Sequence, residues 1–228
     1  MRIGILKTGH APDIVLGELG DYDAMFARLL DGHGFEFDAY DVVDGIFPDG
    51  AHAADGWLVT GSKHGVYEDH PWIAPLEALI RAIRDAGRPL VGVCFGHQII
   101  AQALGGEVIK HPGGWRVGPT EYEIDGTPLT LNAWHQDQVV LAPPGAEVVG
   151  RAEGCEIAAL RLGDRILTVQ PHPEFDATMM DRLIEYRAIG VVPDPLRDHA
   201  RALLDTPTDS AAMAGTIADV LRKGARHG

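Results

Sequence analysis

The segment Gly92-Val93-Cys94-Phe95-Gly96-His97-Gln98 is the most informative part of this chain. It joins an apolar run, Pro89 to Val93, to a run with apolar residues at helical spacing, which predicts a buried strand followed at once by a helix. Such a turn pushes its central residue out of the sheet as a nucleophile elbow, here with Cys94 in place of serine. The glycines at 92 and 96 permit close approach of strand and helix. The helix N-terminus directs N–H groups and a positive dipole end at the thiol, which favours the reactive thiolate.

Cys94 on its own has a second interpretation, that of a buried structural cysteine, which is a common role for a free thiol. The flanking glycines and the switch from strand to helix favour the nucleophile. A nucleophilic cysteine also needs a general base, and the base needs a third group to orient it.

His172 is the best placed of the eleven histidines to act as that base. It lies in Gln170-Pro171-His172-Pro173-Glu174, directly after a predicted strand from Arg165 to Val169. The prolines restrict the backbone on either side. Residues two apart in an extended segment face the same way, so the Glu174 carboxylate can reach the imidazole. An ordinary loop histidine is the alternative, and the matching cysteine elsewhere in the chain favours the catalytic interpretation.

Short apolar runs alternate with helical patterns in the first part of the chain. Apolar runs of this length are typical of parallel strands buried on both faces. We therefore expect a parallel sheet covered by helices on both faces. Strands are predicted at Arg2 to Lys7, Phe35 to Val43, Gly56 to Thr60 and Pro89 to Val93, and helices at Tyr22 to Gly32 and Trp72 to Ala86.

Strand-like runs dominate from Glu107 to Gln170, separated by turns rich in Gly, Pro and Asn. They indicate an antiparallel section added to the parallel sheet. Two helices, Ala177 to Ile189 and Ala211 to Arg222, are predicted to close the chain, with Pro193 to Pro195 as the joint before a helical tail. The strands expected here are Glu107 to His111, Thr120 to Ile124, Leu129 to Ala133, Glu147 to Ala152, Ile157 to Leu162 and Arg165 to Val169.

The bulk composition is that of a folded globular protein. The chain has 228 residues, of which 46% are hydrophobic and 23% are charged, which allows one sizeable domain. We expect a single domain over residues 1–228, with its core over about 1–190 and a helical C-terminal tail over about 194–228.

The formal net charge of -14 argues against two classes of partner. An acidic chain is repelled by phosphate backbones and anionic membrane surfaces, so we expect no nucleic acid and no membrane as partners. No apolar stretch approaches the length of a membrane span, and the run from Met1 to Lys7 is too short for a signal peptide. Two cysteines, Cys94 and Cys155, do not suggest a disulfide scaffold. These features predict a cytoplasmic protein.

The paired motifs Gly92-x-Cys94-x-Gly96-x-Gln98 and Pro171-His172-Pro173-Glu174 resemble those of class I glutamine amidotransferases, and the resemblance covers roughly residues 1–190. The segment Val66-Tyr67-Glu68-Asp69-x-Pro71-Trp72-Ile73 looks closer to the stand-alone, GMP-synthase-like members, which include free-standing γ-glutamyl peptidases. The resemblance implies an α/β fold with a flavodoxin-like, doubly wound, mostly parallel sheet and an antiparallel extension. The pattern of strands and helices favours the same fold.

The resemblance also implies roles for individual residues. In the family the cysteine attacks a glutamine side-chain amide, ammonia leaves, and water releases glutamate from a thioester. By resemblance Cys94 is the nucleophile, and the His172–Glu174 pair activates it. The oxyanion is expected at the N–H groups of Gly61, in the loop after the third strand, and of Phe95, because such donors must be preorganised where the charge develops.

Substrate binding is expected at Gln98, His135 and Ser62. Gln98 resembles the family residue that holds the glutamate part of the substrate, and a helix-surface glutamine is the alternative. His135 resembles a residue of the family's loop near the glutamine pocket, and a structural role is equally open. The loop reads Gly61-Ser62-Lys63 where many members have two glycines and a proline. Arg116 is a candidate for a substrate carboxylate or a solvated residue of a glycine-rich hairpin.

A metal site is the rival use of the histidines. The spacings within the set match no established ligand motif, so no metal is predicted. The chain has neither a phosphate-binding loop nor a dinucleotide-binding glycine fingerprint, which predicts no nucleotide cofactor. The histidines of this rival set are His97, His111, His135 and His172.

Three functions remain open from the sequence. The first is an enzyme acting alone, which hydrolyses a γ-glutamyl amide bond through a glutamyl thioester. The second is a glutaminase subunit that delivers ammonia to a separate synthase, for which an exposed apolar docking face would argue. The third is a non-catalytic relative that binds a metabolite or a partner and regulates it. The intact Cys–His–Glu set favours an enzyme, with glutamine or another γ-glutamyl amide as its substrate.

Overall fold

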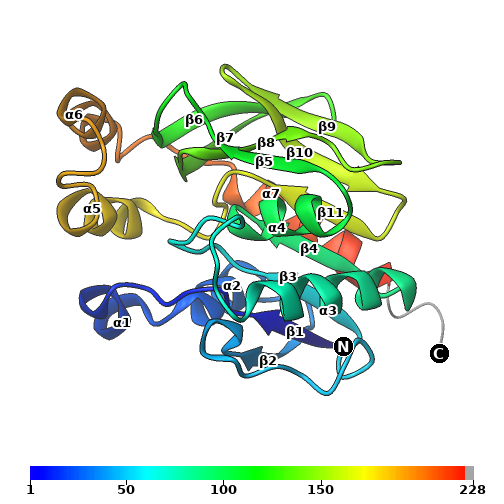
Figure 1. Ribbon diagram of the computed structural model, residues 1–228. Coiled ribbons are helices and arrows are strands. Elements are labelled where there is room, and N and C mark those ends of the chain that lie inside the picture. Colours follow the sequence, from blue (N-terminus) through cyan, green and yellow to red (C-terminus); the bar gives the residue numbers. More distant parts are fainter. Residues whose placement is uncertain (224–228) are drawn as a thin grey trace.

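A nine-stranded sheet forms the centre of the computed structural model, which describes residues 1–223 (Figure 1). Residues 224–228 of the expected tail lie outside the described residues. The strands of this sheet are β1 (Arg2–Leu6), β2 (Glu36–Tyr40), β3 (Gly56–Val59), β4 (Leu90–Val93), β6 (Arg116–Ile124), β7 (Thr127–His135), β9 (Glu147–Ala152), β10 (Cys155–Leu162) and β11 (Ile166–Val169).

The strand order is β2-β1-β3-β4-β11-β10-β9-β6-β7. The first five strands of this order, from β2 to β11, are parallel to one another. From β11 onward, each strand pairs with the next in the antiparallel direction. The parallel part has the flavodoxin-like order, in which ligands bind outside the carboxyl ends of the strands. The expected α/β fold with an antiparallel extension is confirmed. A separate two-stranded sheet joins β5 (Glu107–Lys110) to β8 (Asp137–Leu141).

Two pairs of helices cover the parallel strands. α2 (Tyr22–Leu29) and α7 (Ser210–Leu221) share one apolar core with residues of β1, β4 and β11. α3 (Ile73–Asp85) and α4 (Phe95–Ala103) pack on each other and share a second core with residues of β3 and β4. Among the helices of residues 1–223, none combines the length and apolar character needed to cross a membrane.

Three more helices gather at one end of the molecule, at the left in Figure 1. They are α1 (Asp13–Leu19), α5 (Ala177–Tyr186) and α6 (Asp194–Ala202), and a 3-10 turn covers Val42–Asp44. Their buried residues form a third apolar cluster that includes Phe175. Since Phe175 follows β11 closely, this cluster adjoins the carboxyl end of that strand.

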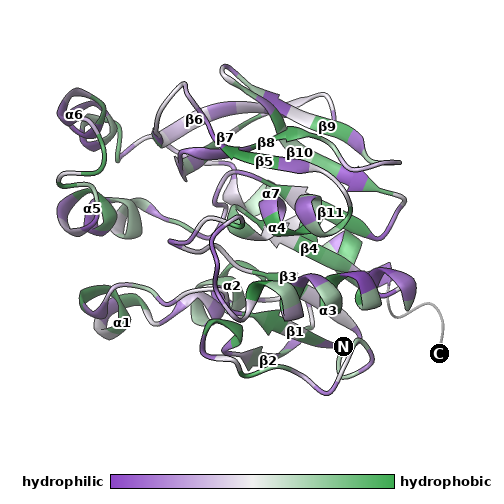
Figure 2. Cartoon of the chain, in the orientation of Figure 1, coloured by the Kyte–Doolittle hydropathy of each residue, from purple (hydrophilic) through white to green (hydrophobic). Residues whose placement is uncertain are grey.

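The burial of the main elements follows their sequence patterns. β3, β4 and β11 are buried at every residue, as expected for parallel strands covered on both faces. Figure 2 shows β1 and β4 in hydrophobic colours, whereas α3 alternates hydrophilic and hydrophobic stretches. α3 buries Leu76, Ile80 and Ile83 at helical spacing. It ends before Gly87, whose φ of 64° suits a glycine that terminates a helix.

Two elements, α1 and β8, are not predicted by the sequence pattern, whereas α6 begins where the helical tail was expected. α1 buries only Val15, so it presents no stripe of apolar residues. β8 begins at Asp137 in a polar stretch and pairs with β5 outside the main sheet. Each of these elements depends on contacts with distant parts of the chain.

The last helix is part of the core, whereas the sequence suggested a tail. Met213, Ile217 and Leu221 of α7 are fully buried in the core shared with the parallel strands. Core residues therefore extend beyond the expected limit near residue 190. The physical reason is that α2 alone leaves part of this sheet face uncovered, and α7 contacts β4 and β11 there.

Trp57 on β3 depends on a glycine in the neighbouring strand. Its indole N–H donates to the carbonyl oxygen of Ala51 at 3.0 Å, and its ring packs against Tyr40 with centroids 5.9 Å apart. Gly4, its register partner on β1, leaves the space that the ring occupies. A Cβ atom at Gly4 would overlap the Trp57 ring.

We expect Gly4→Ala to lower the free energy of unfolding by about 1–3 kcal/mol, the usual cost of overpacking a core. The matched control is Gly215→Ala in α7, where an added Cβ meets no atom within 4 Å. That control should raise stability by up to about 1 kcal/mol, because alanine is the better helix former. Urea unfolding measures both variants, and equal stabilities would contradict the packing described for Trp57.

Candidate active site

Cys94 occupies the turn between β4 and α4 in a strained conformation. Its φ of 54° and ψ of −104° make it one of two non-glycine residues with positive φ within residues 1–223. Such a conformation costs of order 1–3 kcal/mol and persists only where the surroundings enforce it. The Cys94 N–H donates to the Val169 carbonyl at 2.9 Å, and the Gly96 N–H donates to the Thr60 carbonyl at 3.1 Å. The elbow is therefore fixed to the ends of both neighbouring strands, β11 and β3.

Two glycines allow this turn to form. A Cβ atom on Gly92 would overlap the backbone of Gly96, and one on Gly96 would overlap the carbonyl group of Val59. Because no side chain separates them, α4 lies directly on β4 and β3. Helix α4 consequently begins directly after Cys94, which is its N-cap residue.

His172 follows β11 and is held on three sides. Its backbone N–H donates to the Asn132 carbonyl at 2.8 Å, and the ring nitrogen Nδ1 lies 2.7 Å from Oε1 of Glu174. Its ring stacks on Phe175, with centroids 4.0 Å apart and an interplanar angle of 4°. The Glu174 carboxylate accepts a hydrogen bond from the Nδ1–H group, which leaves Nε2 on the other side of the ring available. Within the described residues, Nε2 has no hydrogen-bond partner.

Two opposing effects set the charge of His172. Burial alone would lower the pKa of the imidazole, because a buried charge is costly. The negative charges of Glu174 and Cys94 outweigh burial and raise the pKa of His172 to about 10. His172 is therefore protonated at neutral pH, which is the form that pairs with a cysteine thiolate.

Gly61, which follows β3, lies next to both Cys94 and His172. A Cβ atom placed on Gly61 would lie 3.0 Å from Cε1 of His172 and 3.8 Å from Cβ of Cys94. Among the described residues, no acceptor takes the N–H of Gly61 or that of Phe95. Both N–H groups expected at the oxyanion are thus free to donate, and both belong to residues beside the thiol.

The elbow opens into a cavity of about 340 Å³. Trp115 and Trp134 form one wall, with ring centroids 6.1 Å apart and planes at 62°. Three cationic residues also line the cavity, namely Lys63, Lys110 and Arg187. Two carboxylates, those of Glu68 and Asp137, line it as well, so the cavity offers aromatic walls and charges of both signs to a ligand.

Two of the expected substrate-binding residues lie on the cavity wall. Gln98 donates from Nε2 to the Asp137 carbonyl at 2.9 Å and to Oε1 of Gln170 at 3.1 Å. The side-chain oxygen of Gln98 would therefore be the atom that accepts a hydrogen bond from a substrate. His135 donates from Nδ1 to the Asp137 carbonyl at 3.2 Å. Burial lowers the pKa of His135 to about 3, so its Nε2, which has no partner in residues 1–223, is a buried acceptor.

Ser62, the third expected substrate-binding residue, also lines the cavity. Its hydroxyl donates to the Thr8 carbonyl at 2.6 Å and accepts from the N–H of His64 at 3.2 Å. These bonds anchor the loop after β3 to the segment after β1. The hydroxyl thus has a structural task in addition to its place on the wall.

The four histidines of the rival metal set do not come together as ligands within the described residues. His97 is enclosed by Thr168 and Ile157, with Nδ1 2.7 Å from the Thr168 hydroxyl and Nε2 3.1 Å from the Ile157 carbonyl. Burial lowers the pKa of His97 to about 4, so it is neutral. Arg116 donates to the Gly154 carbonyl at 3.3 Å and does not line the cavity.

Phe175, which stacks on the His172 ring, was not identified from the sequence as a residue of the site. An aromatic residue directly after Glu174 is a signal that could have identified it, since a flat ring is suited to orient an imidazole. Tyr67 was missed as well, and its hydroxyl donates to Oδ2 of Asp137 at 2.9 Å across the cavity rim. The polar residue pattern of that loop carries no indication of this contact.

Comparison with known proteins places the chain in a family. The family model described as Glutamine amidotransferase class-I matches residues 46–189. The chain is 30% identical over 182 residues to Gamma-glutamyl peptidase 4 of Arabidopsis thaliana, covering 73% of this chain and 72% of that protein. It is 36% identical over 204 residues to a GMP synthase of Aeropyrum pernix, covering 83% of this chain and 38% of that protein. The chain belongs to the class I glutamine amidotransferase family, as its motifs suggested.

A solved structure shares the fold. The glutamine amidotransferase of Thermotoga maritima superposes with a TM-score of 0.78, covering 99% of this chain and 98% of that chain. The two sequences are 21% identical, so this likeness concerns the fold alone.

We expect iodoacetamide to label one cysteine of the folded protein at neutral pH, and that cysteine to be Cys94. Cys155 is fully buried, and burial raises its pKa to about 12, so it should not react. Mass spectrometry after timed labelling provides the measurement.

The Glu174→Gln variant tests the charge assigned to His172. Removing the carboxylate removes the charge that raises the pKa of His172, so less imidazolium is present at neutral pH and labelling of Cys94 should slow. In the wild type the imidazolium is lost as the pH rises through about 10, and in the variant it should be lost at lower pH. An unchanged labelling rate between pH 6 and 9 would show that Glu174 does not control the histidine.

Proposed function

We propose that this protein hydrolyses a γ-glutamyl amide bond through a glutamyl thioester on Cys94. The observation that carries the proposal is that Cys94 and His172 line one cavity and that His172 is paired with the buried carboxylate of Glu174. A reduced thiol is required, which fits the cytoplasmic location predicted from the two unpaired cysteines.

In the first half of the reaction, the Cys94 thiolate attacks the γ-carbonyl carbon and forms the C–S bond. The carbonyl oxygen takes up the negative charge, and the N–H groups of Gly61 and Phe95 stabilise it. The imidazolium of His172 then gives its proton to the amide nitrogen, because an amine leaves far more readily than its anion. Collapse of the tetrahedral intermediate breaks the C–N bond and leaves a thioester.

In the second half, neutral His172 takes a proton from water, and the resulting hydroxide attacks the thioester carbon. The C–S bond breaks and glutamate leaves, so that the thiolate and the imidazolium are restored. Glu174 keeps its charge throughout and stabilises the imidazolium by the 2.7 Å contact to Nδ1. Phe175 keeps the ring in one plane for both steps.

The cavity favours a leaving amine larger than ammonia. Its walls include two tryptophans, the apolar side chains of Leu183 and Val191, and the cationic side chain of Arg187. An amino acid or peptide amine carries a carboxylate that could pair with this positive charge. This supports a γ-glutamyl peptide as substrate, in line with the printed name of the Arabidopsis relative.

A glutaminase subunit is the second candidate, and one observation favours it. Ile189 and Val191 are 68% and 55% exposed, and Val191 also lines the cavity. Exposed apolar residues at a cavity mouth are typical of a surface that a partner covers. In that case the partner would be a synthase that receives ammonia from glutamine. The third possibility, a non-catalytic regulator, has no use for the strained Cys94 conformation.

Glutamate release from glutamine and from a panel of γ-glutamyl dipeptides tests the proposal. We expect turnover of dipeptides by the wild type and a loss of at least about a thousandfold in kcat for Cys94→Ala, since the nucleophile is removed. Cys155→Ala is the matched control and should keep its activity. Equal activity of Cys94→Ala and the wild type would overturn the mechanism, and turnover of glutamine alone would favour the subunit.

Arg187→Gln distinguishes the two kinds of leaving group. We expect the KM for γ-glutamyl dipeptides to rise about two- to fivefold, the size of a partly solvated ion pair, with kcat unchanged. The KM for glutamine should stay the same, because ammonia carries no carboxylate. Steady-state kinetics on both substrates provides the measurement, and parallel changes in both would contradict a role for Arg187 in holding the leaving amine.

A further inference from the structure

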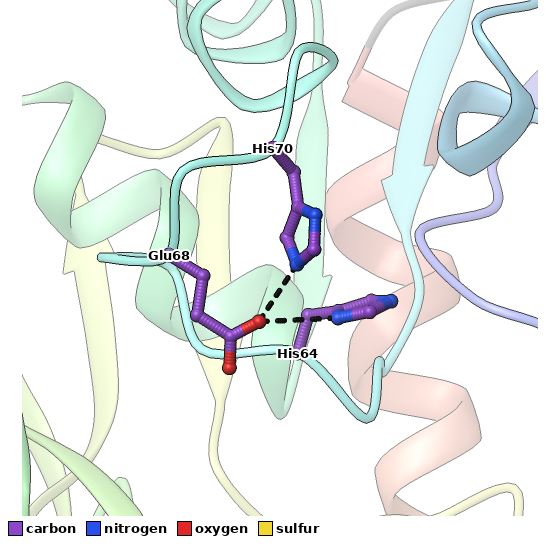
Figure 3. A group of neighbouring side chains, drawn as sticks. All are labelled: His64, Glu68 and His70. Atoms are coloured by element: carbon purple, nitrogen blue, oxygen red, sulfur yellow. Dashed lines mark hydrogen bonds and ion pairs between the residues drawn. The ribbon is translucent and has the colours of Figure 1, made fainter.

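The loop after β3 brings together three side chains that the catalytic mechanism does not use. His64, Glu68 and His70 each present one ligand atom, and the three atoms all lie within 4.8 Å of one another. Figure 3 shows both imidazole rings directed at the same carboxylate oxygen of Glu68. This cluster, called the His–Glu–His cluster below, is distinct from the four histidines considered from the sequence.

The distances in the cluster are close to those of a metal site. Nδ1 of His64 lies 3.2 Å from Oε2 of Glu68, and Nε2 of His70 lies 2.7 Å from the same oxygen. Ligand atoms about 2.0–2.1 Å from a tetrahedral zinc ion are about 3.3 Å apart. A small outward movement of the His70 ring would therefore make room for an ion between the three atoms.

The cluster is held from outside by groups that do not use its ligand atoms, which within residues 1–223 bond only to one another. The other carboxylate oxygen of Glu68, Oε1, accepts the Gly65 N–H at 3.0 Å, which fixes the direction of Oε2. The His70 ring stacks on Trp72, with centroids 5.8 Å apart and planes at 9°. Each imidazole nitrogen that faces the carboxylate presents a lone pair once its proton sits on the other ring nitrogen. Two imidazoles and one carboxylate are a ligand set that zinc takes in proteins.

We propose that His64, Glu68 and His70 bind one divalent transition-metal ion of the zinc type at the rim of the cavity. His64 and Glu68 line the cavity, so the ion would sit beside it. Three protein ligands leave a tetrahedral ion one position for water or for an anionic group of a bound molecule.

Metal binding would stiffen the loop that begins at Gly61. The ion would tie residue 64 to residue 70, and the stacked Trp72 in turn packs on Phe95 with ring centroids 5.5 Å apart. Gly61 and Phe95 are the residues whose N–H groups face the oxyanion in the proposed reaction. The metal thus acts on loop order, and its binding does not depend on that reaction.

Titration of the Cys94→Ala protein with Zn²⁺, followed by calorimetry, tests the proposal free of thiol binding. Co²⁺ provides a second readout, because its visible spectrum reports coordination by nitrogen and oxygen. We expect one equivalent of metal to bind to this protein and to the wild type. Absence of binding to the Cys94→Ala protein would overturn the proposal.

Glu68→Gln in the same background locates the ion. Glutamine keeps an acceptor for the Gly65 N–H, so the loop should retain its fold, but it lacks the carboxylate charge. We expect affinity to fall by at least about tenfold, since even groups that only orient ligands cost about 10- to 100-fold. His70→Ala should lower the metal affinity in the same way. The control is His52→Ala, at a loop histidine outside the cluster, which should leave the metal affinity unchanged. Unchanged affinity in Glu68→Gln would assign the ion elsewhere and refute the site.

Discussion

The contact of Gly96 with the backbone of Val59 is the constraint on which the site depends. Because a Cβ atom there would overlap the Val59 carbonyl, α4 can lie against β3 and β4 only when residue 96 is glycine. That closeness forces a sharp turn at Cys94, whose φ of 54° is sustained by hydrogen bonds to the ends of β3 and β11. The strain is offset by a large buried core, and its result is a thiol presented at the start of a helix.

Parallel pairing then assembles the remaining groups. Strands β3, β4 and β11 are neighbours, so the residues that follow their carboxyl ends arrive at one edge of the sheet. Gly61 follows β3, Cys94 follows β4 and His172 follows β11. The antiparallel extension contributes the Asn132 carbonyl, which fixes the His172 backbone from the opposite side. Electrostatics completes the arrangement, since the Glu174 carboxylate keeps the buried imidazole protonated in spite of its burial.

The loop after β3 has the most varied set of tasks in the molecule. It begins with a residue beside the thiol, holds the Ser62 contact to Thr8, carries the His–Glu–His cluster and ends at Trp72, which packs on Phe95. Changes in this loop can therefore alter the proposed oxyanion site and the cavity together. Leu183 of α5 and the two tryptophans line the cavity from other elements, so the proposed preference for a leaving amine can change without disturbing Cys94, His172 and Glu174.

Local sequence was sufficient to predict the strand-to-helix elbow, the pairing of His172 with Glu174 and the α/β class, because each rests on residues adjacent in the chain or on apolar periodicity. Short elements such as α1 and β8 could not be predicted, since each buries few residues of its own and is stabilised by distant partners. The burial of α7 likewise depends on distant segments that the sheet brings together. The stacking of Phe175 on His172 and the convergence of His64, Glu68 and His70 involve residues close in the chain, and they depend on side-chain directions that are defined only when the chain has folded.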